Sequence, residues 1–457
     1  MASFSTSDIE RATSGTWLQP QDEGQVFTTV DTDTRQIHEG ALFIAFKGDT
    51  FDGHAFVMEA LHKGAAGAIV SAVRPEFKAV TVPIYVVPDT LKAYQDLARF
   101  HRRRFHIPVV AVTGSVGKTT TRNMIATVLS QKLRVLQTEK NFNNEIGLPK
   151  TLLQLTPDHE ACVVEMGMRG LGQIAELAAI AEPTIGVVTN VGKSHIELLG
   201  SQENIAKAKC ELVQALDEHG VAVLNQDDHF VAAMADQCKG KVVGYGITSN
   251  APVRADRIGA NEKGIHFTCR SFDQMMDINI PVIGLHNVYN ALAAVAVARV
   301  VGVSEHQVKK GLAEYRGVPM REEIVRLGAY TFINDAYNAN PASMSESIHT
   351  LANLTKGRKI AVLGGMLELG DWAQAEHEKI GRQIASEGIT ALIALGDLAG
   401  YIATAAKDSG MDAVYTVRTH AEAADVLKGL LKPGDTVLLK ASRGFAMEKI
   451  LPYFERK

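Results

Sequence analysis

Short apolar runs alternate along most of this chain with longer segments whose apolar positions recur at helical spacing. Continuous apolar runs predict buried strands, and apolar positions about every three to four residues predict amphipathic helices. Regular alternation of the two favours a mostly parallel sheet covered by helices on both faces. We therefore expect an α/β protein, and breaks in the alternation divide it into three predicted domains.

Residues 1–88 form the first predicted domain, a small α/β module with strand-like runs at 41–46, 68–71 and 84–87 between Gly and Asp turns. Residues 89–317 form the second, which opens with a helix at 91–104 and an apolar strand at 108–113. Its further strands are expected at 161–165, 185–190 and 221–225, and its further helices at 202–217 and 287–301. The pattern predicts a central domain built on a mostly parallel sheet.

Residues 318–457 form the third predicted domain, where the alternation of strand and helix starts again after Val318 and Pro319. Strands are expected at 359–363, 391–395 and 436–440, and a helix at 374–387. This pattern is typical of a doubly wound, Rossmann-like domain. Ligands of such proteins tend to bind between domains, at the carboxyl ends of strands.

Composition excludes several classes of protein. The chain has 457 residues and a formal net charge of −4, which predicts no nucleic-acid partner. Its four cysteines are far apart and form no C-x-x-C pair, which indicates a reducing compartment. The N-terminus lacks a signal-peptide pattern, and the longest apolar stretch, 291–303, contains Arg299 and is too short to span a bilayer. We expect a soluble cytoplasmic monomer without membrane insertion.

A phosphate-binding loop is the strongest motif. The sequence Gly-Ser-Val-Gly-Lys-Thr at 114–119 follows the expected strand at 108–113 and precedes a segment with helical spacing. Glycines let backbone N–H groups curl around a phosphate, while Lys118 supplies a charge and the Thr119 hydroxyl can bind Mg²⁺. The motif is one residue shorter than the common spacing unless Ala111 stands at its first glycine position. It predicts a P-loop nucleotide site.

Three residues are candidates for a metal site. Glu165 ends an apolar run and is placed as a Mg²⁺ ligand would be beside a phosphate loop. His195 follows another expected strand, where a metal ligand and a hydrogen-bonded loop histidine are equally good explanations. Lys209 lies in the middle of the apolar stripe of the helix at 202–217, whereas Lys207 points to the opposite side. Burial would lower the pKa of Lys209 and allow a carbamate to form with CO₂, although spacing alone favours a snorkelling lysine.

Several motifs together resemble the Mur ligase family, and the resemblance covers essentially the whole chain. The family implies an ATP- and Mg²⁺-dependent ligase that activates a carboxylate as an acyl phosphate and joins it to an amine. It also implies that Lys209 is carbamylated. The matching stretches are Thr-Gly-Ser-Val-Gly-Lys-Thr-Thr at 113–120, Val-Val-Glu-Met-Gly around Glu165, Asn-Val-Gly-Lys-Ser-His-Ile-Glu around His195, Ala-Lys-Ala-Lys ending at Lys209, 285–294, and Lys-Ala-Ser-Arg at 440–443.

Three further stretches resemble the family members that add D-alanyl-D-alanine to UDP-N-acetylmuramoyl-tripeptide and form the UDP-muramoyl-pentapeptide of peptidoglycan synthesis. They are Thr-Asp-Thr-Arg at 32–35, residues 46–54, and Asn-Asp-Ala-Tyr-Asn-Ala-Asn-Pro-Ala-Ser-Met at 334–344. The alternatives are a diamino-acid-adding or folylpolyglutamate-type ligase, and a nucleotide-gated switch that hydrolyses ATP without ligation. The Asn-Ala-Asn-Pro and Thr-Asp-Thr-Arg stretches argue against both other ligases.

The resemblance also implies roles for single residues. ATP and Mg²⁺ would be bound by Gly114, Ser115, Gly117, Lys118, Thr119 and Thr120, with Asn287 and Asn290 near adenine, Arg321 near the nucleotide and Asp335 near the ribose. Thr119, Glu165, His195 and carbamylated Lys209 would hold the metal ions, and Lys118, Lys209, His195 and Glu165 would form the catalytic set. The UDP-sugar would contact Asp33, Thr34, Arg35 and Lys47, the muramoyl peptide Asn141, Asn143 and Asn144, and the dipeptide Tyr337, Asn338 and Asn340.

Three positions depart from the family pattern. Lys140 stands where relatives commonly have Gly, Gly365 where they have Asp, and Ala441 where they have Gly. None of the three belongs to the residues expected to handle ATP.

Overall fold

The computed structural model describes residues 2–19, 24–194, 196–261, 264–354 and 357–455. The chain divides into two compact units. The first unit comprises Met1–Ala111, Leu133–Gly167 and Gln173–Thr184, and the second comprises Val112–Lys132, Met168–Gly172 and Ile185–Lys457. Each unit is described by itself below.

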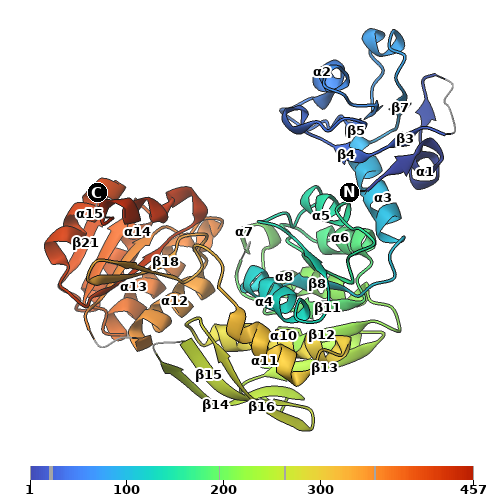
Figure 1. The fold of residues 1–457 in the computed structure, drawn as a ribbon. Coiled ribbons are helices and arrows are strands. Elements are labelled where there is room, and N and C mark those ends of the chain that lie inside the picture. The colour runs from blue at the N-terminus through green and yellow to red at the C-terminus, as the bar shows by residue number, and fades with distance from the viewer. Residues whose placement is uncertain (1, 20–23, 195, 262–263, 355–356, 456–457) are drawn as a thin grey trace. The chain divides into compact units, whose positions relative to one another are not determined.

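The first unit holds a five-stranded sheet in the order β2-β7-β6-β5-β4 (Figure 1). Strands β4 to β7 are parallel, and β2 is antiparallel to β7. One face packs on a core that includes Phe43, Val57 and Phe77. The elements are β1 (Phe4–Ser5), α1 (Thr6–Ala12), β2 (Thr16–Trp17), β3 (Val26–Phe27), β4 (Thr29–Asp31), β5 (Ala41–Ile44), α2 (Val57–His62), β6 (Gly67–Val70), β7 (Ile84–Val86) and α3 (Thr90–Arg102).

A second group of elements completes the first unit. Strands β9 (Val135–Gln137) and β10 (Ala161–Glu165) pair in parallel, and helices α5 (Gly147–Leu152) and α6 (Gln173–Ala181) accompany them. Helix α3 begins where the side chain of Asp89 accepts hydrogen bonds from the backbone of Leu91 and Lys92, which caps its N-terminus. Strand β8 (Val109–Thr113) crosses from the first unit into the second.

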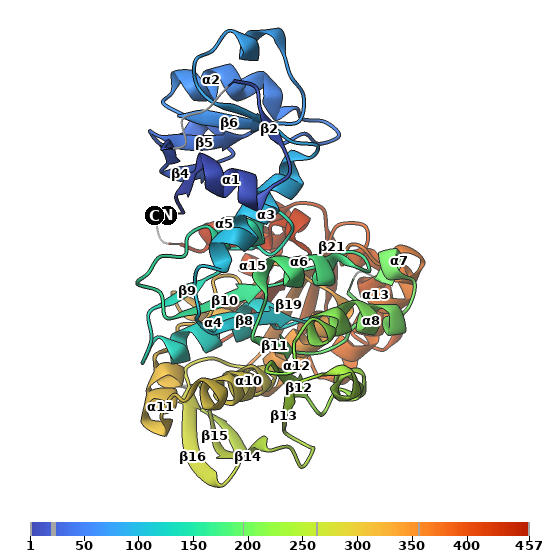
Figure 2. The same ribbon diagram turned by 90° about the vertical axis from the view of Figure 1, so that its right-hand side faces the viewer.

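The second unit contains the sheet that carries the phosphate loop. Strands β11 (Ile185–Val188), β12 (Val221–Asn225), β13 (Lys241–Gly246) and β14 (Val253–Asn261) are parallel, and β15 (Gly264–Ser271) and β16 (Gln274–Ile280) extend them antiparallel. Helices α4 and α10 lie against each other beside this sheet (Figures 1 and 2). The helices are α4 (Lys118–Leu129), α7 (Ile196–Leu199), α8 (Gln202–Gln214), α9 (His229–Ala233), α10 (His286–Val301) and α11 (Glu305–Glu314).

The remaining part of the second unit is a six-stranded sheet in the order β17-β18-β22-β19-β20-β21. Only β17 is antiparallel, to β18. Its core includes Phe332, Ile393 and Val437. The strands are β17 (Glu323–Leu327), β18 (Tyr330–Asp335), β19 (Lys359–Gly364), β20 (Ala391–Leu395), β21 (Val414–Val417) and β22 (Thr436–Lys440), and the helices are α12 (Pro341–Leu354), α13 (Ala373–Ser386), α14 (Ala399–Asp408) and α15 (His420–Leu430).

The α/β class and the Rossmann-like third sheet are confirmed. The strands predicted at 161–165, 221–225, 391–395 and 436–440 have the expected bounds, whereas the helix predicted at 202–217 ends at Gln214 and the strand predicted at 185–190 ends at Val188. Both were overextended because the polar residues that follow leave the regular element while the chain stays buried. Among the described residues, no helix is both long and apolar enough to cross a membrane. The domain boundaries at 88/89 and 317/318 stay a prediction.

Candidate nucleotide and ligation site

The predicted phosphate loop runs from the end of β8 into the N-terminus of α4. Its glycines are required by the backbone: Gly114 has φ +152° and Gly117 has φ +84°. A Cβ atom on Gly114 would lie 1.8 Å from Oγ1 of Thr189, and one on Gly117 would lie 2.8 Å from Oδ1 of Asn290. Any larger residue would therefore displace the loop from the neighbours that shape it.

Asn190, which follows β11, anchors this loop. Its backbone carbonyl accepts from the N–H of Ser115 at 3.0 Å, and its side-chain oxygen accepts from the N–H of Val116 at 2.9 Å. Its side-chain amide and the hydroxyl of Thr189 both donate to the carbonyl of Val116, at 3.0 and 2.7 Å. The sequence analysis did not select Asn190, although a polar residue after a parallel strand is the usual signal of such a contact.

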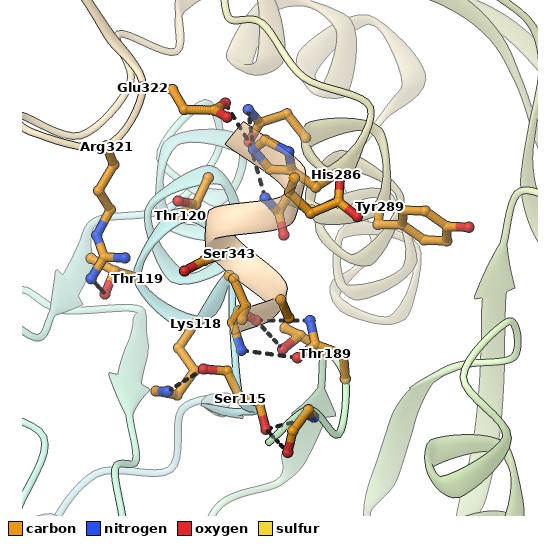
Figure 3. A pocket seen from close by; sticks show the side chains of 18 of the residues that line it. Ser115, Lys118, Thr119, Thr120, Thr189, His286, Tyr289, Arg321, Glu322 and Ser343 are labelled. Atoms are coloured by element: carbon orange, nitrogen blue, oxygen red, sulfur yellow. Dashed lines mark hydrogen bonds and ion pairs between the residues drawn. The ribbon is translucent and has the colours of Figure 1, made fainter. Parts of the chain in front are cut away.

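Lys118 and Thr119 carry the charge and the hydroxyl of the loop (Figure 3). The Lys118 ammonium donates to the carbonyls of Gly114 and Ser115 at 2.7 and 3.3 Å. The guanidinium of Arg321 donates to Oγ1 of Thr119 at 3.2 Å and lies 4.3 Å from the centre of the Tyr337 ring. The structure thus brings Arg321 onto the first turn of α4, as the resemblance implied.

A cavity of about 540 Å³ opens above the loop within the second unit. Most predicted nucleotide residues and two predicted dipeptide residues line it, whereas Gly114 and Tyr337 only contact residues that do. The predicted residues along its wall are Ser115, Gly117, Lys118, Thr119, Thr120, Asn287, Asn290, Arg321, Asp335, Asn338 and Asn340. Residues that the sequence analysis did not select include Asn190, Asp228, Tyr245, His286, Tyr289, Glu322, Ser343, Glu346 and Ser347.

The start of α10 forms one wall of the cavity. The side-chain amide of Asn290 donates to Oδ1 of Asn287 at 3.0 Å, and that of Asn287 donates to the carbonyl of Ile283 at 2.6 Å. The hydroxyl of Thr121 donates to Oδ1 of Asn290 at 2.9 Å. Because each amide is oriented by a partner, the two asparagines present fixed donors and acceptors.

His286 and Glu322 form an ion pair on the same wall, with 3.0 Å between Nε2 and Oε2 (Figure 3). Burial lowers the pKa of His286, but the carboxylate of Glu322, with smaller effects from Glu346 and Asp335, raises this pKa above its ordinary value overall. Glu322 has φ +49°, which is an uncommon conformation for a residue with a side chain. The pair therefore holds positive charge at the cavity wall near neutral pH.

Asp335 and Lys440 form a buried ion pair where β18 and β22 end. The Lys440 ammonium donates to Oδ2 of Asp335 and, at 3.1 Å, to the carbonyl of Asn338. The hydroxyl of Ser347 donates to the same carboxylate oxygen at 2.6 Å. Lys440 therefore fixes both Asp335 and the backbone of the predicted dipeptide segment.

The predicted metal residues fall in different parts of the chain. Lys209 in the second unit is 2% exposed, and its pKa is lowered well below the ordinary value, first by desolvation and then by Lys118. Glu165 in the first unit is buried, and its Oε1 accepts from Nδ2 of Asn143 at 2.8 Å. His195 lies outside the described residues. Within the described part of the chain, no group of three or more His, Cys, Asp or Glu residues is arranged to hold a metal ion.

These observations test whether Mg²⁺ fits the residues present. An unmodified lysine is no ligand for Mg²⁺, which prefers oxygen donors. A neutral amine that is deprived of water, as Lys209 is, can add CO₂ and become an oxygen donor. Glu165 and the hydroxyl of Thr119 are oxygen donors already. The donor chemistry therefore fits Mg²⁺ once Lys209 is modified.

The predicted sugar and peptide residues lie in the first unit. The Arg35 guanidinium donates to Asp33 and holds the pKa of that carboxyl at about 2, while Lys47 is exposed. Thr34 begins a short 3-10 turn that Asp33 caps. Asn143 donates its backbone N–H to the carbonyl of Asn141 at 2.8 Å, and Oδ1 of Asn144 accepts from Gly147 at 2.9 Å.

Two of the three departures have a structural counterpart. Lys140 has φ +49°, the left-handed region that glycine occupies at low cost. A Cβ atom on Gly365 would lie 2.9 Å from Cβ of Leu398 and 2.9 Å from Cζ of Phe445, so an aspartate does not fit there without a shift. Nothing in the structure explains Ala441, which is fully buried.

Comparison with known families matches three successive parts of the chain. Residues 26–102 match the Mur ligase family catalytic domain, residues 112–298 the Mur ligase middle domain, and residues 320–443 the Mur ligase, glutamate ligase domain. UDP-N-acetylmuramoyl-tripeptide–D-alanyl-D-alanine ligase of a Synechocystis species is 40% identical over 431 residues, which cover 92% of this chain and 90% of that protein. The chain belongs to the Mur ligase family.

Other relatives place this Mur ligase in the same way. The ligase of the same name from Bacillus subtilis is 37% identical over 454 residues, covering 99% of this chain and 98% of that protein. A crystal structure of MurF from Acinetobacter baumannii superposes with a TM-score of 0.92 at 31% identity, covering 99% of this chain and 98% of that one. MurF from Thermotoga maritima in complex with ADP gives 0.85 at 28% identity, covering 94% and 97%.

Proposed function

We propose that this Mur ligase uses ATP to join D-alanyl-D-alanine to UDP-N-acetylmuramoyl-tripeptide, forming the UDP-muramoyl-pentapeptide of peptidoglycan synthesis. One observation carries the proposal. A single cavity is lined both by the phosphate loop and by the segment 338–340, which resembles the acceptor segment of the dipeptide-adding members. The relatives that bear this name are 33% to 40% identical over nearly their whole length.

The first chemical step needs positioning and charge neutralisation rather than a protein nucleophile. The carboxylate of the tripeptide attacks the γ-phosphorus of ATP, and ADP leaves with the electron pair of the broken P–O bond. Lys118 and the backbone N–H groups at the start of α4 would stabilise the charge on the transferred phosphoryl group. Arg321, which already touches Thr119, is placed to add a second positive charge.

The second step forms the amide. The neutral amine of D-alanyl-D-alanine attacks the acyl phosphate, and the tetrahedral intermediate collapses with phosphate as the leaving group. Tyr337, Asn338 and Asn340 are proposed to face the dipeptide. Exclusion of water matters here because water would hydrolyse the acyl phosphate.

Magnesium would neutralise phosphate charge while the first step proceeds. We propose Thr119, Glu165, His195 and carbamylated Lys209 as the residues that hold it. The low pKa and the burial of Lys209 support carbamylation, since both keep its amine neutral. Intact mass measured after incubation with and without bicarbonate tests this: a gain equal to one CO₂ is expected, and it should be absent from Lys209→Met.

The nucleotide and UDP-sugar roles follow the resemblance residue by residue. Asn287 and Asn290 are proposed to bind adenine and Asp335 the ribose. Asp33, Thr34, Arg35 and Lys47 are proposed for the UDP-sugar, and Asn141, Asn143 and Asn144 for the muramoyl peptide. The proposed domains are 1–88 for the UDP-sugar, 89–317 for ATP and 318–457 for nucleotide and dipeptide, and the three family matches support this division.

The deciding experiment measures phosphate release from ATP and Mg²⁺ with UDP-N-acetylmuramoyl-tripeptide, with and without D-alanyl-D-alanine, and identifies the product by mass. Release that requires both substrates and yields the pentapeptide is expected. Release that ignores the dipeptide would instead support a nucleotide-gated switch. Activity with a diamino acid or a glutamate in place of the dipeptide would support another ligase of this fold.

A cytoplasmic location, a monomeric state and the lack of a nucleic-acid partner are also proposed. The supply of ATP in the cytoplasm supports the first, and the net charge of −4 supports the third. Light scattering after gel filtration tests the second, with the mass of one 49.3 kDa chain expected.

A further inference from the structure

The loop 191–194, which follows β11, contacts the phosphate loop on one side. The backbone N–H of Gly192 donates to Oγ of Ser115 at 2.8 Å, and that hydroxyl donates to the carbonyl of Gly192 at 3.3 Å. The N–H of Val191 donates to Asp228 at 2.8 Å, and the side chain of Gln202 donates to the carbonyl of Val191 at 2.7 Å. The phosphate loop and the loop 191–194 therefore move together.

On its other side the loop 191–194 contacts the segment proposed to face the dipeptide. The side-chain amide of Asn340 donates to Oγ of Ser194 at 2.8 Å. The opposite end of the Asn340 side chain accepts from the N–H of Ser343 at 2.9 Å, in the first turn of α12. The hydrogen bond between Ser194 and Asn340 is thus a direct link between the phosphate side and the acceptor side of the cavity.

Lys193 lies between these contacts and reaches the start of α13. Its ammonium donates to Oε1 of Glu376 at 2.6 Å and lies 5.1 Å from the centre of the Trp372 ring. The Glu376 side chain is 8% exposed and that of Lys193 is 34% exposed. Close by, a Cβ atom on Gly370 would lie 3.0 Å from the side chain of Glu197, so the chain after the loop also packs against the turn that precedes Trp372.

A buried pair of this kind is not explained by stability alone. Desolvating a carboxylate offsets most of the Coulomb attraction, so apolar residues of similar size would stabilise the fold as well. What an ion pair adds is geometry, because it is satisfied in one relative position of its partners and leaves a buried charge in any other. The cation over the indole ring restricts Lys193 further.

We propose that Lys193, Glu376 and Trp372 form a clamp whose members are positioning residues: they hold the loop 191–194 against Asn340 while the amide bond forms. This inference rests on the proposed function, which supplies the dipeptide as the acceptor. The clamp acts through the hydrogen bond between Ser194 and Asn340. It should therefore govern use of the dipeptide much more than binding of the nucleotide.

Fluorescence tests the clamp without any substrate. The chain has two tryptophans, so Trp17→Phe leaves Trp372 as the only indole. Acrylamide quenching of Trp372 is expected to increase when Glu376→Gln or Lys193→Met is added, because the ring loses the ammonium that covers it. Glu378→Gln is the matched control, since Glu378 lies on the same helix and pairs only with Gln374 and Arg382 of that helix in the described structure. Unchanged quenching in both clamp variants would overturn the proposal.

Kinetics test the positioning role. In Glu376→Gln we expect kcat/KM for the dipeptide to fall about tenfold, as is typical when one member of a coupled pair is removed. The dissociation constant for ATP should stay within about twofold, because the loss is of one contact outside the nucleotide wall. The double reversal Lys193→Glu with Glu376→Lys should recover most of the loss, which a purely structural defect would not allow.

The outcomes separate the two proposals. If the parent protein shows no turnover that depends on the dipeptide, the proposed function fails, and quenching alone decides whether the clamp exists. If the parent ligates the dipeptide but Glu376→Gln and Glu378→Gln have the same kcat/KM, the clamp is overturned and the proposed function stands. A loss of ATP affinity equal to the loss of kcat/KM would also overturn it.

Discussion

Replacing Lys440 by methionine should destabilise the six-stranded sheet strongly. Lys440 is 1% exposed, and the Asp335 that it contacts is 7% exposed. Without the ammonium, the Asp335 carboxylate keeps the hydroxyl of Ser347 as its only close side-chain donor among the printed contacts. Removing one partner of a buried pair costs about 3–5 kcal/mol, because the remaining charge stays desolvated.

This cost predicts a large shift in melting. At about 2–4 °C per kcal/mol for a cooperative unit of this size, the transition of the affected part should fall by about 10 °C in Lys440→Met. Differential scanning calorimetry without nucleotide is the right assay, since a chain with two units can unfold in more than one step. The control is Lys428→Met, which breaks an exposed pair with Asp425 and should leave melting unchanged.

A second variant makes the prediction strict. Adding Asp335→Asn to Lys440→Met removes the stranded charge and should restore most of the lost melting temperature, because a neutral amide is cheaper to bury than a carboxylate. If Lys440→Met melts within about 3 °C of the parent, or if Asp335→Asn lowers melting further, the reasoning that a buried unpaired charge dominates is wrong.

Three other predictions concern the cavity and its surroundings. Gly117→Ala should weaken ATP binding at least about tenfold by calorimetry with an unchanged circular dichroism spectrum, since φ +84° and the 2.8 Å approach to Asn290 both oppose a Cβ atom; unchanged affinity would contradict this. Lys209→Met should melt no lower than the parent, because an apolar side chain replaces a desolvated amine, yet lose ligation; retained turnover would show that no carbamate is needed. Because the pKa of His286 is raised in the folded state, its pair with Glu322 stabilises the fold fully below about pH 6.5 and less as pH rises through the raised pKa, so the melting difference between the parent and Glu322→Gln should be larger at about pH 6 than at about pH 9. A difference that grows with pH would refute that assignment.

The phosphate loop and the buried lysine could be predicted because their signals are local. Strand, glycine turn and helix follow one another within 109–129, and the position of Lys209 in an apolar stripe follows from helical spacing. Its burial at 2% and its lowered pKa agree with the functional explanation over the snorkelling one. The roles given to these residues stay a prediction until they are tested.

Other features depended on packing between distant segments. The ion pair of His286 with Glu322 joins residues on either side of α11, and Glu322 owes its place to a left-handed backbone conformation that no residue type marked. Asn190 looked like one more polar residue after a strand. The antiparallel strands β15 and β16 did leave a signal, since burial alternates along both, but the sequence analysis sought the runs typical of parallel strands.

The hydrogen bond from Arg321 to Thr119 has a consequence for modular exchange. It joins the first turn of α4 to a residue that follows 202 positions later, across the boundary where a recombinant chain would naturally be cut. A chimera that joins residues 1–317 of this protein to the matching part of a relative inherits two half-cavities shaped by separate histories. Substitutions tolerated in one half are tolerated because of what the other half contributes, so such hybrids should fold more often than they turn over substrate.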